Sequence, residues 1–127
     1  MITDVLEGES VQLASELENA RFMTHDVTDE SQWKAAMAAT LKVFGQLDVV
    51  VNNVGIRHDS TPIEDTTIEQ WQKVMSIDLD GVFLGCKHGI RAMEENGGSI
   101  INVSSIYGIV GSATQGPYHA AKGGGAS

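Results

Sequence analysis

Cysteine, proline and basic side chains are scarce in this 127-residue sequence. Cys86 is the single cysteine, so no internal disulfide can form and a reducing compartment, the cytoplasm, is the expected location. Only 8 basic residues stand against 17 acidic ones, and the formal charge of -9 disfavours nucleic acid and anionic membranes as partners because like charges repel. No apolar run is long enough to span a membrane, so we expect no membrane partner.

Metal-binding patterns are also missing. His25, His58, His88 and His119 are not spaced as a ligand set with Cys86, so no metal site is expected. Surface or supporting roles are the simplest interpretation of these four histidines. The apolar content of 42% and charged content of 20% are those of an ordinary globular chain, and the length fits one domain or part of one.

Strands and helices alternate along the sequence. Apolar runs at 47–51 and 99–103, bounded by polar residues or glycine, predict buried central strands, and 1–6 and 20–27 are weaker candidates. Between the second and third strands, apolar residues recur every three or four positions after a capping box of Asp29 and Gln32, and Gly45 closes this helix. The alternation predicts an α/β fold, with a parallel sheet covered by helices on both faces.

A second, longer helix is predicted over 67–96, from a cap at Thr66 or Thr67, with Glu69 and Gln70 as cap partners, to the glycines at 97 and 98. Asp78 lies at the centre of its core-facing stripe, which consists of Trp71, Met75, Val82, Cys86 and Met93. Burying a carboxylate without partners is costly, so either Asp78 faces partners or a functional cavity, or the helix kinks near Asp80 and leaves it solvated. The opposite side is also apolar, so this helix is a candidate surface for a homo-oligomer.

Several polar residues follow predicted strands, where ligands bind in open α/β sheets. Tyr118 and Lys122 are four residues apart at the start of a helix, so they share one face, and a cation beside a phenol favours the phenolate. Ser105 ends one strand region and could donate a hydrogen bond to a carbonyl. Asn52, Asn53 and Gly55 end the other. Each group taken alone is also compatible with an ordinary turn or an exposed helix pair.

In combination, these motifs resemble the short-chain dehydrogenase/reductase family over nearly the whole chain. The segment Asn52-Asn53-Val54-Gly55 is similar to the NNAG segment of the family, and Ser105, Tyr118 and Lys122 have its spacing. The resemblance implies an oxidoreductase that transfers a hydride between NAD(P) and a secondary alcohol or ketone. Tyr118 would be the general acid/base, Ser105 would polarise the carbonyl, and Lys122 would stabilise the phenolate and bind the nicotinamide ribose.

The resemblance extends to the cofactor site. Asp26-Val27 is similar to the adenine-contacting pair of the family, and Asp4 falls where NAD-preferring members carry an acid. Such an acid binds the ribose 2′-hydroxyl and repels a 2′-phosphate, so NAD is expected over NADP. The alternative role for Asp4 is a helix cap. Asp78 stands where the family carries a catalytic Asn, which adds a negative charge near Lys122.

The glycine-rich turn that receives the pyrophosphate in this family has no counterpart here. The chain resembles a piece truncated at both ends, so 1–127 is expected to be a single incomplete Rossmann-like domain. It would lack the first strand and the C-terminal strands, run from the second strand to the start of the Tyr/Lys helix, and be weak or inactive alone. Two alternatives remain open: a shortened non-catalytic protein that keeps the long helix for oligomerisation, and another Rossmann-like enzyme, such as a sugar-nucleotide epimerase.

Overall fold

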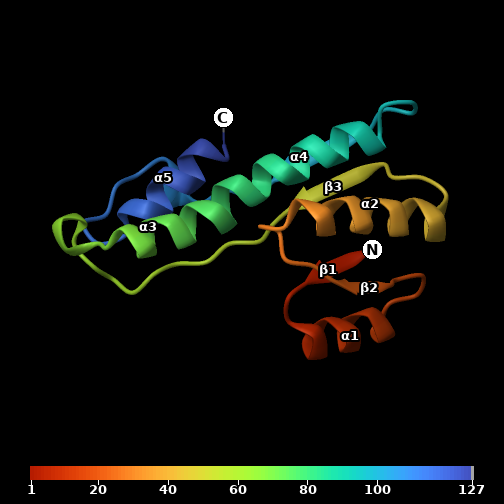
Figure 1. Cartoon of the computed structure of the whole chain (residues 1–127), viewed down its shortest axis with the longest axis horizontal. Coiled ribbons are helices and arrows are strands. Elements are labelled where there is room, and N and C mark those ends of the chain that lie inside the picture. Colours follow the sequence, from red (N-terminus) through yellow and green to blue (C-terminus); the bar gives the residue numbers. More distant parts are fainter. Residues whose placement is uncertain (127) are drawn as a thin grey trace.

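The structure, a computed structural model, describes residues 1–126 and has an α/β architecture (Figure 1). All four predicted strands are present, although each is shorter than expected: β1 Ile2–Asp4, β2 Phe22–Thr24, β3 Val49–Asn52 and β4 Ser99–Asn102. β1 pairs with β2 and β3 with β4, both in parallel, as the alternation with helices predicts. The registers set Asp4 beside Thr24 and Asn52 beside Asn102, so the carboxyl ends of paired strands lie together.

Helices connect the strands. They are α1 Glu7–Glu16, α2 Glu30–Phe44, α3 Ile68–Met75, α4 Gly81–Ala92 and α5 Gly116–Gly124. In Figure 1, α1 and α2 lie on opposite sides of the β1–β2 pair, and α4 runs along β3. α3 and α5 pack against each other at the other end of the molecule. The sequence did not predict α1, whose apolar side chains Val11 and Leu13 remain about half exposed.

The two strand pairs form separate two-stranded sheets in the described residues, without hydrogen bonds between β1 and β3. The predicted parallel strands are therefore present, but they do not form one central sheet with both faces covered. On β3, Val50 and Asn52 are buried toward α4, whereas Val49 and Val51 are about half exposed. Because successive side chains of a strand point to opposite faces, one face of the β3–β4 pair packs against helix and the other does not.

The caps of α2 differ in detail from the predicted capping box. Asp29 is the N-cap, but its carboxylate accepts from the Ser31 amide rather than from that of Gln32. The Gln32 side chain instead donates to Asp29 and accepts from the backbone amide of Asp26, which ties the end of the β2 region to the helix. Gly45 ends α2 at φ 84°, a left-handed conformation that glycine adopts without strain.

The long helix predicted over 67–96 is interrupted. Thr67 and Gln70 form a reciprocal capping box at its start, as predicted. A π-helical turn, η2 Ser76–Asp80, then separates α3 from α4. The helix ends at Ala92 rather than near Asn96, because the backbone leaves the helical region at Met93, whose side chain lies over Gly98. Among residues 1–126, no helix is both long and apolar enough to cross a membrane.

Candidate active site

Asp78 is fully buried in the π-helical turn, so the alternative in which a kink leaves it solvated is wrong. Its Oδ1 accepts a 2.7 Å hydrogen bond from the Ile56 amide, just after the Asn-Asn-Val-Gly segment. Its Oδ2 lies 3.6 Å from Lys122 Nζ. Burial raises the pKa of the Asp78 carboxyl above its ordinary value, while the Ile56 hydrogen bond and Lys122 act in the opposite direction. Single-turn π-helical segments are frequent at functional sites, because the extra residue re-aims side chains.

Lys122 connects three distant segments of the chain. Its side chain is 6% exposed, and Nζ donates a 3.3 Å hydrogen bond to the Val54 carbonyl as well as facing Asp78. The ammonium also lies 5.7 Å from the centre of the Tyr118 ring, one helical turn earlier in α5. The predicted sharing of one helix face by Tyr118 and Lys122 is therefore confirmed, and a buried cation accompanies the phenol ring.

Gly55 makes this arrangement possible. A Cβ atom at this position would lie 2.7 Å from Lys122 Nζ and 3.0 Å from Asp78 Oδ2. Both distances are shorter than ordinary contacts, so any side chain here would displace the buried ion pair. The glycine of the Asn-Asn-Val-Gly segment is thus required by close approach of charged side chains from two other elements.

Ser105 lies between β4 and α5, as predicted. It is the N-cap of a 3₁₀ turn, η3 Ile106–Gly108, and its Oγ accepts from the Tyr107 amide at 3.2 Å. The Tyr107 ring in turn packs edge-on against that of Tyr118, with ring centres 6.0 Å apart. Ser105 and Tyr118 therefore border the same residue. The neighbouring Ser104 hydroxyl donates to the Lys122 carbonyl, which fixes α5 against this loop.

Asn52 and Asn53 differ in their surroundings. The Asn52 side chain is buried beneath α4, where Nδ2 donates to Asn102 Oδ1 at 2.8 Å and Oδ1 has no hydrogen-bond partner. α4 can approach this closely only because residue 85 is glycine, since a Cβ there would overlap Asn52. Asn53 is exposed at the end of β3. Asn52 thus holds the strand end in place from below, and Asn53 is accessible.

A pocket of about 340 Å³ lies where the two strand pairs face each other, at their carboxyl ends. Its lining includes Asp4, Asp26, Val27, Asn52 and Asn53 among the predicted cofactor residues, together with apolar side chains such as Val54 and Ile77. The lining does not include Ser105, Tyr118 or Lys122. Val54 joins the two regions, because it lines the pocket and its carbonyl accepts the Lys122 hydrogen bond.

The acids at this pocket make local hydrogen bonds. Asp4 Oδ1 accepts from the Leu6 amide at 2.9 Å, but Leu6 is itself the N-cap of α1 and that helix has no side-chain cap, so the alternative role of Asp4 as a helix cap is wrong. Asp26 Oδ1 accepts from the amide and hydroxyl of Thr28. Arg21 lies at the amino end of the β1–β2 pair, beside Ile2, and its guanidinium donates to the Ala20 carbonyl. Asp4 lies at the other end of the same pair, beside Thr24.

Sequence reasoning underestimated two histidines, for which surface roles are wrong. His25 is 2% exposed, lines the pocket, and lies with Nδ1 3.2 Å from Thr3 Oγ1 while its Nε2 has no partner. Burial lowers the pKa of His25, which favours the neutral ring. His88 is 5% exposed and bonded to Glu30. A histidine that follows three strand residues is a weak signal for burial, and no local pattern pairs His88 with a residue 58 positions away.

The comparison with known proteins addresses the chain as a whole. The family model described as short chain dehydrogenase matches residues 1–127. This chain belongs to the short-chain dehydrogenase family. Ser105, Tyr118, Lys122 and Asp78 all lie within the matched residues.

Curated relatives and a solved structure agree with this membership. The NADP-dependent (R)-specific alcohol dehydrogenase of Lentilactobacillus kefiri is 49% identical over 105 residues, 81% of this chain and 41% of that protein. The trans-4-hydroxycyclohexanecarboxylate dehydrogenase of Sinomonas cyclohexanicum is 44% identical over 133 residues, 96% of this chain and 51% of that protein. A short chain dehydrogenase from Mycobacterium smegmatis matches with a TM-score of 0.89 at 34% identity, covering 97% of this chain and 54% of that one. This short-chain dehydrogenase chain spans about half the length of the curated relatives it matches.

Proposed function

We propose that the whole protein transfers a hydride between NAD and a secondary alcohol or ketone, with Tyr118 as the general acid/base. The observation that carries this proposal is the buried Lys122 ammonium, which lies beside the Tyr118 ring while Asp78 and the Val54 carbonyl hold it from the other side. A fixed cation next to a phenol stabilises the phenolate, and the phenolate can accept the proton of an alcohol. In the reverse direction, the neutral phenol returns that proton to the carbonyl oxygen.

The remaining roles follow from position. The Ser105 hydroxyl, which borders the same Tyr107 as Tyr118 does, would donate a hydrogen bond to the substrate oxygen and orient it. Lys122 would bind the nicotinamide ribose as well as stabilise the phenolate. Asp78, which stands where the family usually has Asn, would hold Lys122 and the Ile56 amide in place. Its negative charge offsets part of the lysine's effect on the phenol.

The residues at the pocket suit a dinucleotide. The pocket lining includes the apolar side chains of Val27, Val54 and Ile77, which suit a flat base. Asp4, Asp26, Val27, Asn52, Asn53 and Gly55 would hold the cofactor, together with Tyr118 and Lys122. When bound, NAD supplies the hydride acceptor at C4 of its nicotinamide.

NAD is favoured over NADP because the Asp4 carboxylate lies at the carboxyl end of β1. The hydrogen bond from the Leu6 amide goes to Oδ1 of this carboxylate. A carboxylate here repels a 2′-phosphate. Arg21 lies at the opposite end of the strand pair, and its guanidinium is bonded to Ala20. The relative from Lentilactobacillus kefiri is NADP-dependent by name, so this preference is a property proposed for the present chain.

The substrate class proposed is a small secondary alcohol or its ketone. The relatives are named for such compounds, including a hydroxycyclohexanecarboxylate and, in mycobacteria, a 3-alpha-(or 20-beta)-hydroxysteroid. Exposed apolar side chains follow Ser105 directly, namely Ile106, Ile109 and Val110. They fit an apolar substrate body better than a charged one.

We also propose that α3 and α4, which make up most of the helix predicted over 67–96, mediate a homo-oligomer, because Ile68, Phe83 and Ile90 on these helices are about 60% exposed. A cytoplasmic location remains the proposed one. Size-exclusion chromatography of the wild type and Phe83→Glu is the direct check on assembly. A monomeric wild type would remove this part of the proposal.

The main experiment measures cofactor absorbance with the whole protein and a panel of secondary alcohols. We expect turnover with NAD that is lost in Tyr118→Phe, while NAD binding persists, because phenylalanine keeps the ring and removes only the proton-transferring hydroxyl. Turnover that survives in Tyr118→Phe would reject Tyr118 as the acid/base. A folded protein without cofactor affinity or turnover would favour the non-catalytic alternative.

A further inference from the structure

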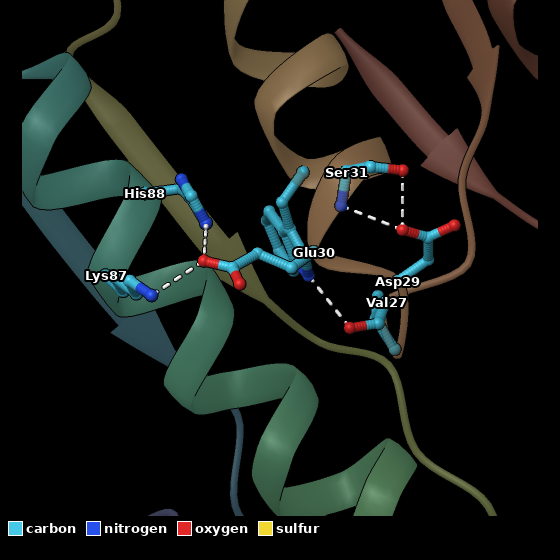
Figure 2. A network of polar contacts seen from close by, with 7 residues as sticks. Val27, Asp29, Glu30, Ser31, Lys87 and His88 are labelled. Carbon is cyan, nitrogen blue, oxygen red and sulfur yellow. Dashed lines mark hydrogen bonds and ion pairs between the residues drawn. The ribbon is translucent and has the colours of Figure 1, made fainter.

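A carboxylate links the two helices that border the cofactor pocket. Glu30, in the first turn of α2, accepts at Oε1 a 2.6 Å hydrogen bond from Lys87 Nζ and a 3.1 Å bond from His88 Nε2, both on α4 (Figure 2). The partners are 57 and 58 residues away in the sequence. The bonds to Lys87 and His88 lower the pKa of Glu30, so the carboxylate is charged at neutral pH. We name Glu30, Lys87 and His88 the Glu30 clamp.

The N-terminal turn of α2 also binds Asp26 and Val27, which form one wall of the pocket. The Trp33 indole donates a 2.9 Å hydrogen bond to the Val27 carbonyl, and the Gln32 side chain accepts from the Asp26 amide. Figure 2 shows Val27 and Glu30 near each other at the start of α2. Asp26 and Val27 are therefore bonded directly to the first turn of α2.

α4 forms the facing wall. A Cβ at Gly81 would lie 2.9 Å from Val27 Cγ2, so Val27 packs directly on the helix backbone. Gly81 and His88 are seven residues apart, or about two turns, so they share one face of α4. Val27 and Gly81 both line the pocket, whereas none of the three clamp residues does. The Glu30 clamp, whose Glu30 and Lys87 side chains are 42% and 32% exposed, thus bridges α2 and α4 on the face where Val27 meets Gly81.

We infer that Glu30 is a positioning residue for the cofactor: through the clamp it holds Val27 against Gly81 and so keeps the adenine end of the pocket at its binding width. This inference rests on the proposed function, because it assigns the adenine end of NAD to the wall formed by Asp26 and Val27. Loss of the clamp should weaken cofactor binding and leave the chemistry at Tyr118 unchanged, since Lys122 is held independently by Asp78 and Val54.

The test uses the whole protein and its Glu30→Gln variant, which keeps side-chain size and removes the charge. Isothermal titration with NAD should give a Kd raised about two- to fivefold, as expected for weakening a partly exposed ion pair. The KM for NAD should rise equally, with kcat and the KM for the alcohol unchanged. Glu69→Gln is the matched control, because Glu69 also lies in the first turn of a helix but, within the described residues, makes no side-chain bond that links two helices.

The outcomes separate this inference from the proposed function. Wild type without NAD affinity would defeat the proposed function, whereas wild-type affinity with equal Kd values for Glu30→Gln and Glu69→Gln would overturn the clamp alone. A fall in kcat with an unchanged Kd for NAD would also overturn it. If Glu30→Gln does not fold, Lys87→Met, which leaves the His88 bond intact, should still raise the Kd two- to threefold or so. An unchanged Kd in that folded variant overturns the inference.

Discussion

Lys122 Nζ lies 3.6 Å from Asp78 Oδ2 in the interior of the protein, and the backbone of residues 54–56 binds both side chains. The Val54 carbonyl accepts from the lysine, and the Ile56 amide donates to the aspartate. Asp78 and Lys122 are 44 residues apart, so the ion pair joins the π-helical turn to α5 through the loop after β3. In the proposed mechanism, this pair sets how strongly Lys122 stabilises the Tyr118 phenolate.

Asp78→Asn should shift the pH–rate profile of alcohol oxidation to lower pH, by about one pH unit. The reason is that the variant removes a negative charge that offsets Lys122, so less alkaline conditions suffice to form the phenolate. Asparagine keeps an acceptor for the Ile56 amide, so the fold should persist. Initial rates between pH 6 and pH 10 or so would measure the shift. Superimposable profiles for the two proteins would remove the charge effect.

Gly55→Ala should reduce kcat about a hundredfold, the cost of displacing a catalytic group by roughly 1 Å. The added Cβ would lie 2.7 Å from Lys122 Nζ and would push the ammonium away from Tyr118. Gly8→Ala is the control, because nothing lies within 4 Å of its added Cβ and it is within α1. Steady-state kinetics of both variants decide the matter: equal rates would show that the site tolerates the methyl group.

Asp4→Asn should raise the ratio of kcat/KM for NADP to that for NAD by about tenfold, because it removes the charge that repels a 2′-phosphate. Asparagine retains an acceptor for the Leu6 amide, so the start of α1 should be undisturbed. Kinetics with both cofactors provide the measurement. A wild type that already prefers NADP would contradict the proposed preference.

Glu30→Gln should destabilise the protein at neutral pH and cease to do so in acid. The pKa of Glu30 is lowered in the folded protein by Lys87 and His88, so its contribution is present above the ordinary carboxyl pKa and is lost as pH falls through the lower, folded value. Urea midpoints of wild type and variant should therefore converge below about pH 4. A gap that stays constant from pH 7 to that range would show that the carboxylate charge does not contribute.

Local signals in the sequence located most elements correctly. The α2 helix, the capping box of Thr67 and Gln70, and the four parallel strands follow from periodicity and caps, which act within a few residues. α1 was not predicted, because its apolar residues form no continuous buried stripe. The end of the long helix was placed too late, because Met93 leaves the helix to cover Gly98, a contact that caps alone do not encode.

The sequence by itself determined which residue types are available at each strand end and that Asp78 lies on the apolar stripe of its helix, since helical spacing and strand-end position are properties of the local chain. Only the tertiary structure decided that Asp78 reaches Lys122 and the Ile56 amide, that Gly55 leaves room for them, and that Glu30 meets His88. These contacts join residues 22 to 67 positions apart, and their distances depend on how the helices pack, which no local pattern specifies.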